Sequence, residues 1–250
     1  MRCLLVLWDI DFTLIDAGGV GTRLYRMVFR DMFGAELPGA ADMAGRTDRA
    51  IVLDTLGRAG IPEPRQHLDQ FLARLAALAP AGRELTERHS RALPGAAAAL
   101  DALAAYGAAA QDGDGTRARD GAPDVRVVQS VLTGNVRPMA EMKLGALGLD
   151  AHLDLAIGAY GESHEARAEL VHLARDNAAR SYGADFSGPA TVLVGDTPLD
   201  VAAALETGAR AVAVATGGTT AARLAASGAH AVLADLTDTP AVLAAILAGG

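Results

Sequence analysis

The amino-acid sequence predicts an α/β fold with a doubly wound parallel sheet and an inserted helical domain. Positions 4–8 are apolar on both faces of a would-be strand, which is typical of a buried parallel strand. Short apolar runs alternate with helical patterns from 125 to 247, whereas 16–89 shows helical patterns without strand-like alternation. Such alternation builds a parallel sheet covered by helices on both faces. We therefore expect an α/β core made of 1–15 and 90–250, with 16–89 as a separate helical domain.

The expected elements follow from the spacing of apolar residues. In the inserted domain, helical spacing predicts helices over 22–33, 48–59 and 66–78. After a helix over 96–106, an irregular stretch over 107–124 predicts an exposed loop. The predicted strands that follow span 125–132, 154–157, 191–194, 211–214 and 231–233. The predicted helices between and after them span 138–147, 166–182, 199–207, 219–227 and 240–247.

The composition argues against several classes of protein. The chain has 250 residues, of which 51% are hydrophobic, and its net charge of -8 offers no basic surface for nucleic acid. No apolar run approaches the roughly 20 residues of a membrane span, and the apolar start reaches Asp9 too early for a signal peptide. Cys3 is the single cysteine, which suits a reducing compartment. We expect a cytoplasmic monomer or weak homodimer that binds neither nucleic acid nor membranes.

Two carboxylates, Asp9 and Asp11, follow the first strand directly. Open α/β sheets bind their ligands at the carboxyl ends of the strands, so both acids can face a crevice there. Like charges this close are unfavourable unless a cation lies between them or one of them takes a proton. The pair therefore predicts a divalent metal, an acid/base role, or both.

Further polar residues follow later strands and should reach the same edge of the sheet. Thr133 and Gly134 suit a phosphoryl oxygen, because a hydroxyl and helix N-terminal amides can surround it. Asp196 is a hard oxygen ligand for Mg²⁺, and Asp200, one helical turn on, is a second ligand or an orienting group. Thr-Gly-Asn is also common turn chemistry, and Asp196 alone could be a helix cap.

These motifs resemble those of the haloacid dehalogenase superfamily. Asp-Ile-Asp-Phe-Thr at 9–13 looks like its first motif, DxDx(T/V), and Thr133 matches its second. The stretch at 195–200, Gly-Asp-Thr-Pro-Leu-Asp, looks like its fourth, GDxxxD. Gly-Arg-Thr-Asp at 45–48 resembles the GxTD stretch of phosphoglycolate-phosphatase-like and phosphoglucomutase-like members, in which the helical domain is a cap over the site.

The resemblance implies a Mg²⁺-dependent phosphatase that acts on a small phosphorylated metabolite. Asp9 would be the nucleophile and become an aspartyl-phosphate, and Asp11 would be the general acid/base. The implied metal ligands are Asp9, Asp11 through its backbone carbonyl, Asp196 and Asp200. The implied substrate-binding residues are Thr133, Gly134, Asn135 and, in the cap, Arg46.

The third motif of the family, a Lys or Arg, departs from the pattern and leaves two candidates. Arg167 lies near the start of a helix that follows a strand end, as the family arrangement requires. Lys143 is the only lysine among 22 basic residues, and it lies in the helix after Thr133. Position favours Arg167 as the cation beside the nucleophile.

Three other functions stay open on the same fold. A phosphomutase shares the whole motif set and differs in how well the closed cap excludes water. A haloalkanoate dehalogenase lacks the second acid, so Asp11 argues against it. A non-catalytic binding protein is disfavoured by the intact set of acids.

Overall fold

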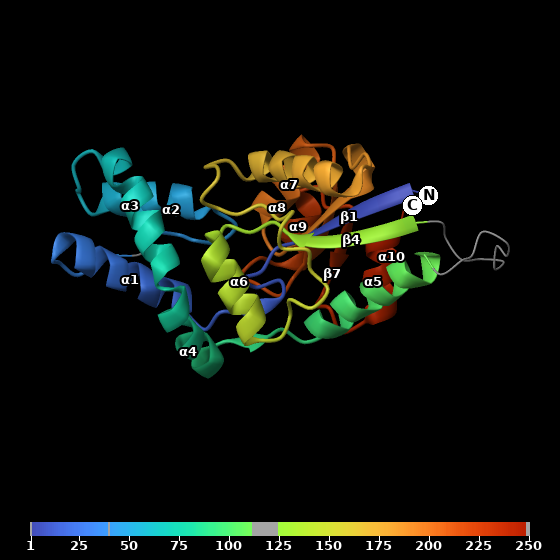
Figure 1. Ribbon diagram of the computed structural model, residues 1–250, viewed down its shortest axis with the longest axis horizontal. Coiled ribbons are helices and arrows are strands. Elements are labelled where there is room, and N and C mark those ends of the chain that lie inside the picture. The colour runs from blue at the N-terminus through green and yellow to red at the C-terminus, as the bar shows by residue number, and fades with distance from the viewer. Residues whose placement is uncertain (1, 40, 112–124, 249–250) are drawn as a thin grey trace.

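The computed structural model describes all residues except 1, 40, 112–124, 249 and 250. Its described part contains a five-stranded parallel sheet with the order β4-β1-β5-β6-β7 (Figure 1). The strands are β1 (Arg2–Trp8), β4 (Val125–Val131), β5 (Thr191–Gly195), β6 (Arg210–Val214) and β7 (Ala231–Leu233). Strand β1 lies between β4 and β5, so its carboxyl end has a strand on each side. The predicted α/β class with a parallel sheet is confirmed.

Two helical layers cover the sheet because β1 is apolar on both faces. Leu4, Val6 and Trp8 pack into one cluster with residues of helices α5 and α10, whereas Leu5 and Leu7 pack into another with α7, α8 and α9. These helices are α5 (Ala96–Gln111), α7 (Arg167–Tyr182), α8 (Pro198–Glu206), α9 (Ala221–Ala226) and α10 (Thr239–Leu247). The first strand is thus buried on both faces, as its sequence predicts.

A group of helices lies at one end of the molecule, beyond the carboxyl ends of the strands (Figure 1). They are α1 (Val20–Phe33), α2 (Asp48–Arg58), α3 (Pro64–Ala77) and α4 (Ala79–His89), and we call them the cap. The short antiparallel strands β2 (Ile15–Asp16) and β3 (Arg91–Ala92) pair where the chain enters and leaves it. All four helices fall within the predicted 16–89 segment.

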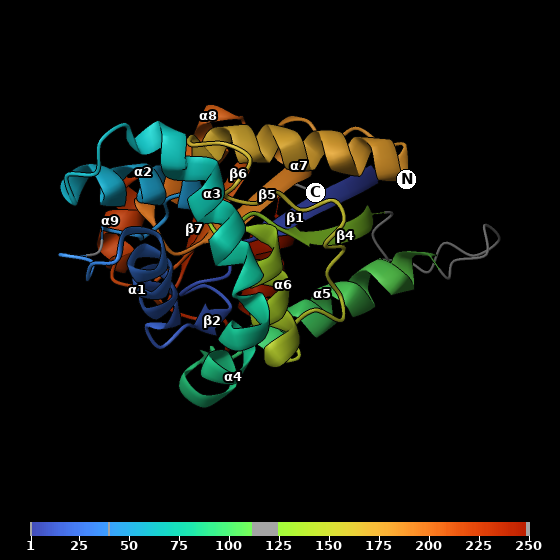
Figure 2. The same cartoon turned by 60° about the vertical axis from the view of Figure 1, so that its left-hand side comes forward.

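The cap has its own apolar cluster, which extends onto helix α6 (Arg137–Ala146) of the core. Val136, Met139 and Met142 join this cluster from the α6 side. Helix α6 accordingly lies beside α3 and α4 (Figure 2). Helix α6, which follows strand β4, is therefore the part of the core against which the cap packs.

Some predicted elements are wrong in detail. The stretch 154–157 is not a strand, because Asp154 accepts a hydrogen bond from the Ala156 amide and so stabilises a turn. Helix α5 continues to Gln111, so residues 107–111 of the predicted loop are helical, and the rest of that prediction, 112–124, lies outside the described residues. Helix α4 was not predicted, because Pro80 and Gly82 interrupt its pattern.

Among the described residues, we find no helix with both the length and the apolar character that crossing a bilayer requires.

Candidate active site

The predicted polar residues converge at the carboxyl edge of the sheet, under the cap. Asp9 follows β1, Thr133 follows β4, and Asp196 follows β5. All three are buried and line one cavity of about 400 Å³. The far wall of this cavity is made by the cap helices, so the site lies between core and cap.

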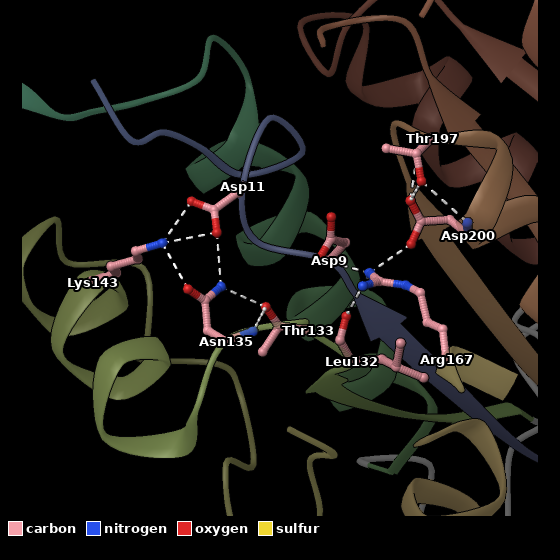
Figure 3. A network of polar contacts seen from close by, with 9 residues as sticks. All are labelled: Asp9, Asp11, Leu132, Thr133, Asn135, Lys143, Arg167, Thr197 and Asp200. Carbon is pink, nitrogen blue, oxygen red and sulfur yellow. Dashed lines mark hydrogen bonds and ion pairs between the residues drawn. The ribbon is translucent and has the colours of Figure 1, made fainter. Parts of the chain in front are cut away.

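Asp9 lies in a buried group of three carboxylates and one guanidinium, of which Figure 3 shows Asp9, Asp200 and Arg167. Oxygen atoms of Asp9, Asp196 and Asp200 lie within 4.8 Å of one another. Arg167 Nη2 is 2.8 Å from Asp9 Oδ1 and 2.6 Å from Asp200 Oδ1. Of the two candidate cations, Arg167 is thus the one beside the predicted nucleophile.

Local structure places Asp200 and Arg167 in this group. Arg167 is the first residue of α7. Asp200 belongs to the capping box of α8, where its Oδ2 accepts hydrogen bonds from Thr197 Oγ1 at 2.6 Å and the Thr197 amide at 3.0 Å. Both oxygens of Asp200 are therefore engaged, which suits an orienting group. The helix cap is Thr197, and Asp196 faces the cavity.

Burial dominates the electrostatics of this group. Desolvation raises the pKa of Asp9 to about 7; Arg167 opposes the shift and Asp200 adds to it. Desolvation, then repulsion from Asp9 and Asp200, raises the pKa of Asp196 to about 8. Three carboxylates facing one guanidinium thus form a set of hard oxygen donors with excess negative charge, which fits a divalent cation such as Mg²⁺. Gly217 leaves room there, because a Cβ on it would lie 1.8 Å from Asp196 Oδ2.

Asp11 belongs to a second, separate group (Figure 3). Lys143 Nζ lies 2.7 and 2.8 Å from its two carboxylate oxygens, and Asn135 Nδ2 donates to Asp11 Oδ2 at 2.7 Å. Lys143 also donates to Asn135 Oδ1 at 2.8 Å, and Asn135 Nδ2 donates to Thr133 Oγ1 at 2.7 Å. Lys143 is 5% exposed and Asp11 31% exposed in their side chains. The second acid therefore has its own cation and stays accessible.

Arg46 lines the cavity, but its guanidinium contacts other groups of the cap. Its Nη1 lies 2.7 Å from Asp54 Oδ2 and 3.1 Å from the carbonyl of Asp42, and its Nη2 donates to the Ala50 carbonyl at 3.2 Å. The backbone of Arg46 is close to Gly134, where a Cβ would lie 1.9 Å from the Arg46 carbonyl oxygen. This arrangement indicates that Arg46 organises the cap loop over the turn at Gly134.

One residue of the site, Asp48, was not predicted from the sequence to have a functional role. Helix α2 begins at Asp48, as the sequence predicts, and Thr47 is its N-cap; the Asp48 side chain is buried between cap and core. Asp48 Oδ1 accepts from Tyr25 Oη at 2.6 Å, and Oδ2 accepts from the Val136 amide at 2.8 Å. Burial raises its pKa to about 6. The Gly-Arg-Thr-Asp stretch was the signal that could have indicated this contact.

A comparison with models of protein families finds a match to part of the chain. Residues 170–239 match the model of the family described as HAD-hydrolase-like, where HAD stands for haloacid dehalogenase. This segment contains Asp196 and Asp200. No curated protein matches the chain.

Solved structures resemble the chain over nearly its whole length. A predicted phosphatase from Clostridium acetobutylicum is 14% identical with a TM-score of 0.65, over 97% of this chain and 99% of that one. A HAD family hydrolase from Deinococcus radiodurans, solved with bound phosphate and sodium, is 22% identical with a TM-score of 0.52, over 97% and 95%. A protein from Bacteroides vulgatus named as a candidate β-phosphoglucomutase is 14% identical with a TM-score of 0.60, over 98% and 89%. These likenesses concern the fold.

Proposed function

We propose that the chain is a haloacid dehalogenase-like hydrolase, in keeping with the family match over residues 170–239, and that it acts as a Mg²⁺-dependent phosphatase of small phosphomonoesters through an aspartyl-phosphate. The observation that carries the proposal is the different environment of the two acids after β1. Asp9 is buried beside Arg167 Nη2, whereas Asp11 is partly exposed beside Lys143 Nζ. Two carboxylates in unlike surroundings can divide a nucleophilic and a proton-transfer role.

In the first step, a carboxylate oxygen of Asp9 attacks phosphorus while the bond to the ester oxygen breaks. Asp11 donates a proton to the departing alkoxide, which leaves as the alcohol. In the second step, Asp11 takes a proton from a water molecule as that water attacks the phosphorus. The bond to Asp9 breaks, and inorganic phosphate and the free Asp9 carboxylate result.

The remaining groups bind and orient. Thr133 Oγ1 and the turn at Gly134 and Asn135 hold phosphoryl oxygens. Arg167 neutralises the nucleophile and one phosphoryl oxygen. When bound, Mg²⁺ supplies neutralisation of the phosphoryl charge, and Asp9, Asp196 and the backbone carbonyl of Asp11 would hold it, with Asp200 orienting Arg167. Lys143 and Asn135 hold the Asp11 carboxylate at the cavity.

A phosphomutase is the second candidate, because the cap contacts the core through Asp48 and Gly134 and so can exclude water. A dehalogenase is disfavoured by Asp11 with its own cation, and a binding protein by the complete acid set. We further propose a cytoplasmic location and a monomer or weak homodimer, in keeping with the single cysteine and the acidic charge.

The test is release of inorganic phosphate from a panel of small phosphate esters, with Mg²⁺ and after chelation. We expect Mg²⁺-dependent release, lost in Asp9→Asn and Asp196→Asn. Transfer of the phosphoryl group within a sugar phosphate, without phosphate release, would favour the mutase. Absence of both activities with any divalent cation would favour the binding protein.

A further inference from the structure

The wall of the cavity that faces away from the phosphoryl site is mostly apolar. It is built by buried side chains of three cap helices and of α6: Leu24, Tyr25, Ile51, Leu75 and Met139. In the proposed phosphatase, the part of the substrate that leaves as the alcohol must point toward this wall, because the phosphoryl group is bound at the opposite, core side. The side chains of this wall therefore determine which alcohol parts of a phosphate ester can bind.

The cations that line the described cavity already have partners. Arg46 contacts Asp54 at 2.7 Å, Lys143 contacts Asp11 at 2.7 Å, and Arg167 contacts Asp9 at 2.8 Å. Of these, Arg167 and Lys143 belong to the chemistry of the phosphoryl group. Among the described residues that line the cavity, the cap side thus presents no cation that is available for a second anionic group of a substrate.

Acidic groups on the cap side make a second anion still less favourable. Asp48 and Asp42 both line the cavity. The Asp48 oxygens are taken by Tyr25 Oη and the Val136 amide, so an ammonium group would have to be desolvated beside the apolar wall without a free carboxylate oxygen from Asp48. Asp42 is exposed, so an ion pair with its carboxylate would be screened by solvent and would contribute little to binding.

Phe12 adds an aromatic surface at the site. It lies between Asp11 and Thr13, lines the cavity, and is 44% exposed. Its φ of 59° is unusual for a residue with a side chain. The backbone holds this conformation: the Phe12 amide donates to the Ile15 carbonyl at 2.7 Å, and Thr216 Oγ1 donates to the Phe12 carbonyl. The exposed ring offers an apolar contact rather than a charged one.

We propose that the substrates are phosphate monoesters of small, uncharged and largely apolar alcohols, without a carboxylate, a second phosphate or an ammonium group. This inference rests on the proposed phosphatase function. A cavity of about 400 Å³ is at the small end of ligand sites, so after the phosphoryl group is bound, only a small alcohol part fits under the cap.

The first test compares kcat/KM for n-butyl phosphate, 2-phosphoglycolate and O-phosphoethanolamine at saturating Mg²⁺. We expect n-butyl phosphate to be preferred by about 10-fold or more, since one or two methylenes in an apolar pocket give discrimination of about this size. An equal or higher kcat/KM for either charged ester would overturn the proposed substrate class and leave the phosphatase proposal intact.

If neither these three esters nor the panel of phosphate esters described above is hydrolysed, the phosphatase proposal fails, and binding decides the inference separately. Calorimetry with n-butylphosphonate and phosphonoacetate should then give tighter binding of n-butylphosphonate by about 10-fold. Tighter binding of phosphonoacetate, or equal binding, would contradict the apolar wall.

A matched pair of variants tests the wall directly. Thr22 lies half-buried on α1 at the cavity and has no role in the proposed chemistry. Thr22→Lys should raise the kcat/KM ratio of 2-phosphoglycolate to n-butyl phosphate by about 10-fold, because it adds the missing cation. Thr22→Met, which has similar length and no charge, should leave the ratio unchanged. An unchanged ratio in Thr22→Lys would show that the alcohol part does not contact this wall.

Discussion

Asp9 and Asp11 are two residues apart in the sequence, yet their surroundings are opposite. Asp9 is buried with Asp196, Asp200 and one guanidinium, and burial raises its pKa to about 7. Asp11 has a carboxylate that is 31% exposed and is held by Lys143 and Asn135. The same side chain can therefore have two functions, because burial and the neighbouring charges differ.

The backbone explains why two residues are enough to separate the groups. The Asp9 amide still donates to the Val194 carbonyl of β5 at 2.8 Å, so Asp9 stays within the sheet. Beyond it the chain leaves the sheet, and Phe12 has a φ of 59°. Asp11 therefore turns toward α6, where Lys143 lies, whereas Asp9 remains beside α7 and Arg167.

The largest effect should come from removing the cation of the buried group. Arg167→Ala leaves Asp9 and Asp200 without their guanidinium, so we expect kcat to fall by about 10²–10³-fold or more. The free energy of unfolding should also fall, by about 3–5 kcal/mol. Steady-state kinetics and denaturant unfolding measure both quantities.

Arg175→Ala is the matched control, because Arg175 lies on the same helix and bonds to Thr191 Oγ1 and the Thr207 carbonyl, away from the acids. It should reduce stability without a comparable loss of kcat. If Arg167→Ala kept a kcat close to wild type, Asp9 would not depend on this cation.

A smaller and more selective effect is expected from the cation of the accessible group. Lys143→Met should lower kcat/KM for n-butyl phosphate by about 10–10²-fold, since kcat/KM reports the first step, in which Asp11 loses its position as proton donor. The kcat/KM for p-nitrophenyl phosphate should fall much less, because its leaving group needs no protonation in that step. Equal losses on both esters would mean that Lys143 acts on the phosphoryl group or on folding, and not through Asp11.

Much of this arrangement can be predicted from the sequence, because it follows from periodicity and strand ends. An apolar run ending in Asp9 indicates a buried parallel strand, and the carboxyl ends of such strands share one edge. Position in the chain favoured Arg167 as the cation beside Asp9, and the structure places it there. The pairing of Lys143 with Asp11 could not be predicted, because only packing brings the two side chains together. The contacts of Asp48 with Tyr25 and the Val136 amide were not predicted, since a contact between two domains leaves no local pattern in the sequence.

The contact that Asp48 makes between cap and core should make the free energy of unfolding depend on pH. Burial raises the pKa of Asp48 from 3.8 to about 6, so between these values the folded state holds a proton that the unfolded state has lost. This group therefore favours folding below about pH 4, and its contribution is lost as the pH rises to about 6. The expected size is on the order of 1–3 kcal/mol.

Asp48→Asn should remove this dependence. The free energy of unfolding of the wild type minus that of the variant, measured from pH 4 to 7, should fall as the pH rises. A difference that stays constant over this range would show that Asp48 titrates normally.

The smallest effect is expected at Arg46, which bonds within the cap. Arg46→Ala should lower Tm slightly, since the contact with Asp54 is lost. It should leave the ratio of kcat/KM for 2-phosphoglycolate and n-butyl phosphate unchanged, and Asp54→Ala should have a similar effect on Tm. A selective loss on 2-phosphoglycolate in Arg46→Ala would instead make Arg46 a contact for an anionic substrate group.

The central claim, that Asp9 carries the phosphoryl group, is tested most directly by trapping the intermediate. Enzyme turning over n-butyl or p-nitrophenyl phosphate with Mg²⁺ is quenched with borohydride, which reduces an aspartyl-phosphate to homoserine, and the peptide is analysed by mass spectrometry. We predict homoserine at position 9 in the wild type and none in Asp9→Asn. Continued release of phosphate with no reduced residue, or with the modification at Asp11 or Asp196, would contradict the account.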